Sequence, residues 1–144
     1  MFARLASVFA VLLILASAQA QDLKSITRHY KPNDSLRYQV EFEGDPKFDN
    51  VNLGFYLQGS VLPDQPGFQT YFAIGRITRI GPGVYDVEGT VPENAATGTY
   101  QIQRVNASLG PASKEYDTSG LKLTIQVDND SKYSFPPLKS ISQE

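Results

Sequence analysis

The sequence predicts an all-β fold, an antiparallel β-sandwich of about seven strands that follows a secretory signal peptide. Three observations lead to this prediction. Beyond residue 20, apolar and polar residues alternate with a period of two, which is typical of strands with one buried face. Clusters of Pro, Gly, Asn and Asp separate the alternating segments. No helical periodicity lies between these segments, which favours antiparallel sheets over alternating strands and helices.

The first 20 residues have the three regions of a signal peptide. Arg4 supplies a positive charge, residues 5–16 form a short apolar run, and the small residues Ala18 and Ala20 precede the predicted cleavage site. The apolar run is shorter than the ~20 residues that a membrane-spanning helix needs. We therefore expect cleavage before Gln21, a secreted or periplasmic protein, and no membrane insertion after cleavage.

The chain beyond the signal has the length of one domain. Residues 21–127 are predicted to form the sandwich, and residues 128–144 an exposed C-terminal tail, because the tail loses the alternation and contains Pro136-Pro137. The chain has no Cys, so the fold depends on packing rather than on disulfides. Its formal net charge is -2, without a basic stripe. Nucleic acid is therefore not an expected partner.

Four segments show the clearest alternation of apolar and polar residues. They are residues 36–43, 51–57, 85–91 and 121–127. In the first segment the apolar side chains of Leu36, Tyr38, Val40 and Phe42 fall on one face, and the residues between them are polar. Each segment is therefore expected to be a strand with a core face and a solvent face.

Two further segments are irregular. Residues 68–80 carry apolar residues on both parities, so we expect a bulge or two short strands there. Residues 99–109 change parity between Ile102 and Val105. This change predicts a bulge in a long strand and turns Arg104 outward.

One stretch has a recognisable pattern. Residues 87–102 consist of a strand that ends in Val-Pro, a turn of small residues, and Gly-Thr-Tyr leading into a long strand. The pattern, centred on residues 87–109, resembles bacterial secreted and cell-surface immunoglobulin-like domains. The resemblance implies an immunoglobulin-like sandwich in which Tyr100 forms a tyrosine corner and Ile102 replaces the second core cysteine. It implies little about function, because such domains serve as spacers, adhesins and modules attached to enzymes.

The sequence gives no support for an enzyme. It has a single His, His29, no Cys and no Gly-x-Ser-x-Gly motif. Nucleophilic catalysis needs a base that a third group orients, and His29 is expected to be an ordinary exposed residue. Carboxylate pairs occur by chance in a chain with 15 acidic residues. A hydrolase is therefore the least favoured function.

Calcium is the ion that the residue types could bind, since only oxygen ligands are numerous. One candidate group is Asp45, Asp49 and Asn50. A second candidate group is Asp128, Asn129 and Asp130. Neither group follows the spacing of an EF-hand, and Asp and Asn also form turns through their side chains. The main expectation is therefore that the protein has no cofactor.

Aromatic side chains are the candidate ligand-binding residues. Tyr56 and Tyr71 fall on the solvent-facing parity of neighbouring strands, and Tyr30 or Phe68 could extend them into a platform of rings. Such rings can pack against a protein or a sugar, although Tyr is also common on strand faces without any ligand. We expect an exported, non-catalytic binding or accessory module with a protein or polysaccharide partner. The alternatives are a carbohydrate-binding module and a structural protein that self-associates through its edge strands.

Overall fold

A computed structural model describes residues 27–144, so the predicted signal peptide lies outside the described residues. Residues 27–144 contain nine strands and one short 3-10 turn, η1. The elements are β1 (His29–Tyr30), β2 (Ser35–Glu41), β3 (Asn50–Gln58), β4 (Tyr71–Ile74), β5 (Arg76–Gly81), β6 (Val84–Thr90), β7 (Gly98–Leu109), β8 (Ala112–Asp117), η1 (Ser119–Leu121) and β9 (Thr124–Val127). Over this range, no helix has the length and apolar character that crossing a membrane requires.

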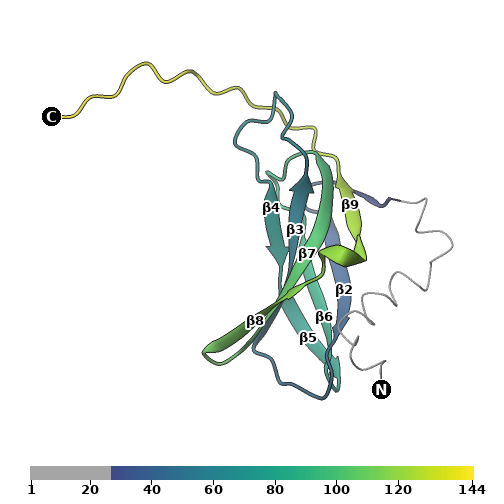
Figure 1. Ribbon diagram of the computed structural model, residues 1–144. Helices are drawn as coiled ribbons and strands as arrows, with labels where there is room; N and C mark the ends of the chain where they lie inside the picture. The colour runs from purple at the N-terminus through teal and green to yellow at the C-terminus, as the bar shows by residue number, and fades with distance from the viewer. Residues whose placement is uncertain (1–26) are drawn as a thin grey trace.

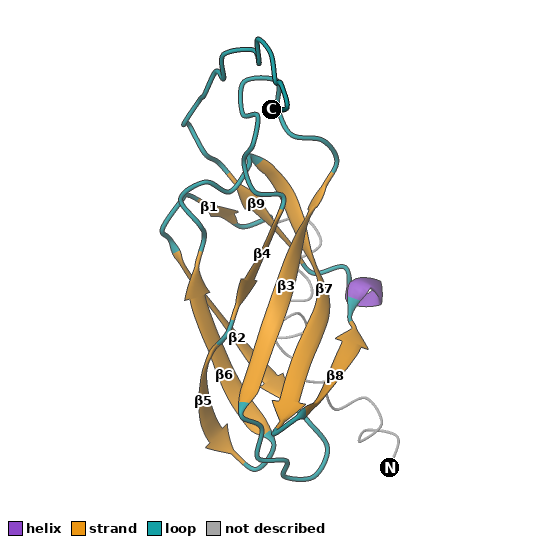
Figure 2. Cartoon of the chain, turned by 90° about the vertical axis from the view of Figure 1, so that its left-hand side faces the viewer, coloured by secondary structure: helices purple, strands orange, loops and turns teal. Residues whose placement is uncertain are grey.

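The strands form two sheets that pack face to face (Figure 1, Figure 2). Sheet A has the order β1-β9-β7-β3-β4, with β8 paired to the far half of β7, and sheet B has the order β2-β6-β5. The strand pairs are antiparallel except β1 with β9, which are parallel. The all-β sandwich that the sequence predicts is therefore present.

The hydrophobic core lies between the two sheets. The apolar side chains of Leu36 and Val40 in β2, and of Phe42 directly after it, are at most 5% exposed, as the alternation predicts. Phe55 of β3 stacks on Phe72 of β4 with 4.8 Å between the ring centroids. Each fully buried large side chain stabilises the fold by about 1.5–3 kcal/mol. Packing of this kind provides the stability of a chain that lacks disulfides.

Both irregular segments have the structure that the sequence predicts. Residues 68–80 contain two short strands, β4 and β5, and these strands belong to different sheets. In β7 the register against β3 shifts next to Gly54, which leaves Gln103 as the bulged residue. Because of the bulge, Val105 lies fully in the core and Arg104 lies on the outer face of sheet A.

Two parts of the fold differ from the prediction. The alternation over residues 121–127 predicts a strand along the whole segment, but only β9 is extended. Lys122 adopts a left-handed backbone conformation (φ 55°) at the end of η1, and this conformation interrupts the strand. The alternation does not predict β8, because its residues are nearly all exposed. β8 and the end of β7 form a hairpin that projects from the sandwich (Figure 1).

The C-terminal segment is only partly the exposed tail that the sequence predicts. Asn129 is 5% exposed, and the Tyr133 amide donates a hydrogen bond to the Asp64 carbonyl at 3.0 Å. Residues 136–144 are all exposed, and the yellow C-terminal end of the chain leads away from the sandwich (Figure 1). Residues 128–133 therefore belong to the folded body, because their backbone is hydrogen-bonded to loops of the sandwich, and the projecting tail begins later.

Candidate functional site

Tyr56 and Tyr71 lie side by side on the outer face of sheet A. They are register partners in the adjacent strands β3 and β4, and their ring centroids are 4.6 Å apart with 46° between the ring planes. Tyr71 is 37% exposed and Tyr56 is half-buried. The parity of the two strands thus brings these rings together on the solvent side.

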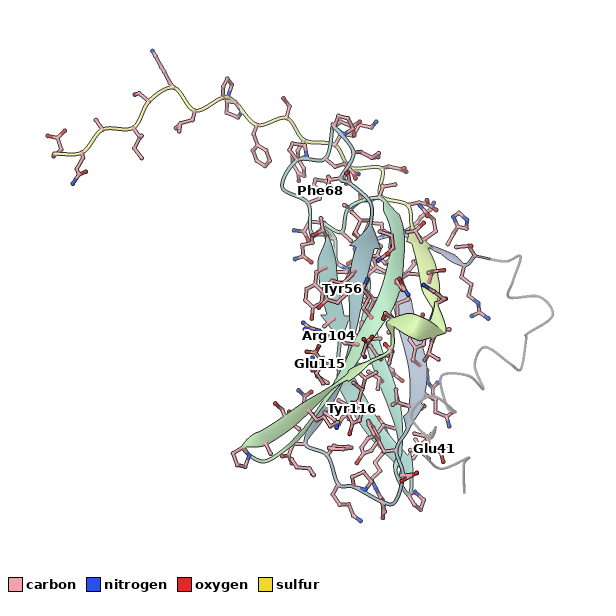
Figure 3. The ribbon with its side chains drawn as sticks, in the orientation of Figure 1. Glu41, Tyr56, Phe68, Arg104, Glu115 and Tyr116 are labelled. Atoms are coloured by element: carbon pink, nitrogen blue, oxygen red, sulfur yellow. The ribbon has the colours of Figure 1, made fainter. Side chains whose placement is uncertain are left out.

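Arg104 completes this group of side chains (Figure 3). Its guanidinium carbon lies 5.4 Å from the Tyr56 ring centroid and 5.5 Å from that of Tyr71, within the range of a cation–π interaction. Its Nη1 donates to Glu115 Oε1 of β8 at 3.0 Å. We call Tyr56, Tyr71 and Arg104 the tyrosine–arginine cluster. The outward parity of Arg104 follows from the bulge, but its position over the rings does not follow from the sequence pattern.

Gly54 forms the floor of the tyrosine–arginine cluster. A Cβ atom at this position would lie 3.2 Å from Arg104 Cγ, 3.2 Å from Tyr71 Cε1 and 3.3 Å from Tyr56 Cε1. These distances are tighter than most real Cβ contacts. The three side chains therefore converge over this stretch of backbone because glycine leaves the space to them.

The cluster carries one positive charge and two neutral rings. The contact with the Tyr71 hydroxyl raises the pKa of Arg104, and burial raises the pKa of Tyr56 against the opposing effect of the Arg104 charge. Arg104 Nη2 lies 3.5 Å from the Tyr71 hydroxyl, the outer limit for a hydrogen bond. Arg104 Nε is buried and has no acceptor among residues 27–144. The hydrogen-bond donors of the Arg104 guanidinium thus have only some of their acceptors within residues 27–144.

The outer face of sheet B has a different character, because its charges pair with one another. Arg37 of β2 pairs with Asp86 of β6, and its Nε lies 3.5 Å from Glu88 Oε2. Arg76 of β5 donates to Glu88 Oε1 at 2.6 Å. These four side chains form a ladder across the three strands. Sheet B therefore presents internally matched charges rather than a group with an unsatisfied donor.

Tyr30 and Phe68 do not join the two tyrosines, contrary to the prediction. Tyr30 belongs to β1, at the opposite edge of sheet A from β4, and packs against the core. Phe68 is 7% exposed and packs against the Tyr133 ring with 5.5 Å between centroids. Figure 3 shows Phe68 near the end of the sandwich, away from Arg104. The predicted platform is therefore reduced to Tyr56 and Tyr71.

Two of the candidate calcium ligands are engaged with other partners. Both oxygens of Asp45 accept hydrogen bonds from Arg79, at 2.6 and 2.7 Å, and Oδ1 also accepts from the Gly83 amide at 3.0 Å. Hydrogen bonds from Arg79, followed by those from Lys47, lower the pKa of Asp45 to about 2. Asp49 accepts from a backbone amide at Gly110. These carboxylates therefore stabilise loop conformations through hydrogen bonds.

The other candidate ligands are exposed or hydrogen-bonded to other groups. Asn50 is exposed at the start of β3, and Asp130 is exposed beyond β9. Asp128 Oδ2 lies 2.8 Å from Nδ1 of His29, which is exposed as predicted. The Asn129 side chain binds backbone carbonyls. In the part of the chain that the structure describes, no group of three or more His, Cys, Asp or Glu side chains could hold a metal ion.

A buried group of polar side chains fixes the root of the tail, and the sequence pattern does not predict it. Gln65 is 1% exposed, and its Nε2 donates to the carbonyls of Asn129 at 2.8 Å and Ser131 at 3.0 Å. The Thr97 amide donates to Gln65 Oε1 at 2.9 Å. Asn129 Nδ2 donates to the Ala95 carbonyl at 2.8 Å. We call Gln65, Thr97 and Asn129 the amide hub.

Tyr100 and Ile102 are buried residues that support the fold. The Tyr100 hydroxyl lies 2.8 Å from the Ala96 carbonyl and 3.0 Å from the Gln69 carbonyl. The bond to Ala96, four residues upstream, is the kind that a tyrosine corner makes. Burial raises the pKa of Tyr100 to about 12. Ile102 is 1% exposed, so both residues serve the core rather than a ligand.

The tyrosine–arginine cluster is thus the group in which predicted site residues meet at the surface. It combines two neighbouring rings and a positive charge on the outer face of sheet A. No protein-family model matches the chain, and no curated protein matches it. The functional argument therefore depends on the geometry of the cluster.

Proposed function

We propose that the chain is an exported, non-catalytic binding module that holds a protein partner on the tyrosine–arginine cluster. The observation that carries the proposal is the convergence of Tyr56, Tyr71 and Arg104 over Gly54 on an exposed sheet face. Tyr and Arg are among the residue types most enriched at binding hot spots. Export rests on the signal peptide predicted for residues 1–20.

The position of Arg104 favours a protein over a polysaccharide as the ligand. A sugar stacks on the open face of an aromatic ring, whereas the guanidinium lies over the rings of both Tyr56 and Tyr71. A protein partner can pack against the rings and the guanidinium together. It can also supply an acceptor to Arg104 Nη2, whose contact with the Tyr71 hydroxyl is as long as 3.5 Å.

Photo-cross-linking in the exporting organism tests the proposal. A photoreactive phenylalanine analogue at Tyr71 is expected to give covalent protein adducts. The matched control position is Thr78, an exposed residue of β5 in sheet B, which is expected to give none. Equal labelling at the two positions, or no adduct at either, would contradict the proposal.

A second measurement separates a protein ligand from a polysaccharide. Native affinity electrophoresis runs the purified chain through gels that hold a panel of polysaccharides, with and without calcium. The chain is expected to migrate as it does in a plain gel. Retardation that Tyr71→Ala abolishes would replace the protein ligand with a polysaccharide.

A further inference from the structure

The C-terminal tail carries the most exposed large apolar side chains among the described residues. Phe135, Leu138 and Ile141 are 63%, 80% and 87% exposed, and they recur at every third position. Pro136-Pro137, between the first two, favour a polyproline II helix, which has about three residues per turn and rises about 3.1 Å per residue. In that conformation the three side chains share one face, spaced by about 9 Å. We call them the tail stripe.

The root of the tail is fixed to the sandwich. The amide hub holds the backbone of Ser131, and Lys132 Nζ donates to Asp64 Oδ2 at 2.7 Å. The rings of Tyr133 and Phe135 stack with 6.3 Å between centroids and 17° between planes. Residues 136–144 are all exposed and extend away from the body (Figure 1). The tail is therefore presented outward from a fixed base, with its apolar face uncovered.

We propose that the tail stripe of one copy docks on the tyrosine–arginine cluster of a second copy. This inference rests on the proposed function and names the partner of the same surface. Polyproline II segments bind aromatic surfaces because the stiff helix loses little entropy on binding. Tyr56 and Tyr71 provide the aromatic surface. The carbonyls of a polyproline II backbone have no internal hydrogen bonds, so they can accept from Arg104 Nη2, whose contact with the Tyr71 hydroxyl is at the 3.5 Å limit of a hydrogen bond.

The stiffness of the tail favours a second copy over the same chain. Pro136-Pro137 restrict the backbone to extended conformations where it leaves the sandwich. A return to its own β3 and β4 would require a reversal at this point. Docking of one tail on the next copy is a heterologous, head-to-tail contact, which closes into a ring or continues as a chain of copies.

Sedimentation velocity of the purified exported chain tests the inference through variants on both sides of the contact. Leu138→Ser/Ile141→Ser alters the stripe at positions that make no contact with the sandwich, and Tyr71→Ala removes half of the aromatic surface. Each is expected to weaken self-association at least about tenfold. Ser140→Ala/Gln143→Ala, which lies off the stripe, is the matched control and is expected to associate like the wild type.

Mixing the two kinds of variant provides the decisive result. Tyr71→Ala keeps an intact tail, and the stripe variant keeps an intact cluster. The mixture is therefore expected to form a one-to-one heterodimer that neither variant forms alone and that does not grow further. A mixture that remains monomeric, or a wild type that remains monomeric at high concentration, would overturn the inference.

Two controls complete the experiment. Thermal melting of each variant shows whether a loss of association reflects a loss of fold, and Arg104→Gln is a second cluster variant that is expected to weaken association as well. If the wild type is monomeric but Tyr71 still cross-links to a different protein, the inference fails and the proposed function stands. If the wild type is monomeric and Tyr71 gives no adduct, both fail.

Discussion

The two ends of the sandwich are closed by different chemistry. At the end where the tail leaves, the neutral side chains of Gln65 and Asn129 are buried among backbone carbonyls. At the other end, near the turn between β5 and β6, Asp45 and Arg79 form an ion pair whose side chains are each more than a third exposed. Each end also has a buried tyrosine whose hydroxyl donates a hydrogen bond to a loop carbonyl. This residue is Tyr100 at the first end and Tyr85 at the second.

The comparison shows what each kind of contact can do for a loop. Buried neutral hydrogen bonds persist across pH and salt, and removal of one partner leaves an unsatisfied group in the interior. An exposed ion pair contributes little and weakens when salt screens it or acid protonates it. At the end where the tail leaves, the exposed ion pair of Lys132 and Asp64 adds to the buried hydrogen bonds, so only the buried part of the attachment resists changes in pH and salt.

Removal of the amide hub should produce the largest effect. Asn129→Ala deletes the donors to the Glu93 and Ala95 carbonyls, so we expect the free energy of unfolding to fall by about 2–4 kcal/mol in urea titrations. Asn106→Ala, on the outer face of sheet A, is the matched control and should cost less than about 1 kcal/mol. Equal losses would remove the distinction between the fully buried amide of Asn129 and the partly buried amide of Asn106.

The two buried tyrosines should have similar effects on stability. The Tyr85 hydroxyl donates to the Pro46 carbonyl at 2.6 Å and accepts from the Phe48 amide at 2.9 Å. Tyr85→Phe and Tyr100→Phe are each expected to lower the free energy of unfolding by about 1–2 kcal/mol. Tyr133→Phe, at an exposed ring, should leave it unchanged. A loss at only one end would show that the two tyrosines are not equivalent.

Alkaline pH should act on Tyr100. Burial raises its pKa to about 12 in the folded chain, against about 10 for an unfolded tyrosine. Because the folded value is the higher one, this contribution to stability is complete below pH ~10 and is lost as pH rises through ~12. Unfolding free energies measured over this range should fall less steeply for Tyr100→Phe than for the wild type. Parallel curves would contradict this expectation.

The smallest effect should come from Asp45, and it should depend on pH. Its folded pKa of about 2 lies below the value of about 3.9 for an unfolded Asp. The contribution is therefore present above pH ~4 and is lost as pH falls toward ~2. Asp45→Asn should lower the urea midpoint slightly at neutral pH and flatten the acid side of the profile, so that the variant and the wild type converge as pH falls toward ~2. An unaltered acid side would show that the pair with Arg79 does not act on stability.

The sequence predicts the strands that bury one face, because burial on one side produces alternation. β2, β3 and β6 are of this kind, and the parity change around Gln103 also predicts the bulge. β8 escapes prediction because it is exposed on nearly every residue. The amide hub escapes because its members, Gln65, Thr97 and Asn129, lie in loops far apart in the sequence and have no common period.

For the candidate site, the sequence likewise predicts which face of a strand each side chain occupies but not which side chains meet. Parity places Tyr56, Tyr71 and Arg104 on outward faces, but the contact among them depends on the register of three strands. The error over Tyr30 arises because parity gives the face of a strand and not its place in a sheet. Its strand pairs with β9 at the far edge of sheet A.

The parallel pairing of β1 with β9 determines how the protein would respond to mechanical tension. The Gln126 amide donates to the Arg28 carbonyl, and the Asp128 amide donates to the Tyr30 carbonyl. A pull between Arg28 and the tail acts along both strands, so these hydrogen bonds are loaded together in shear instead of being unzipped one at a time. In copies joined through their tails, the force would instead enter each sandwich at β3 and β4 and reach its tail through β7 and β9, so the β1–β9 pair would be loaded only by a pull on the N-terminal side.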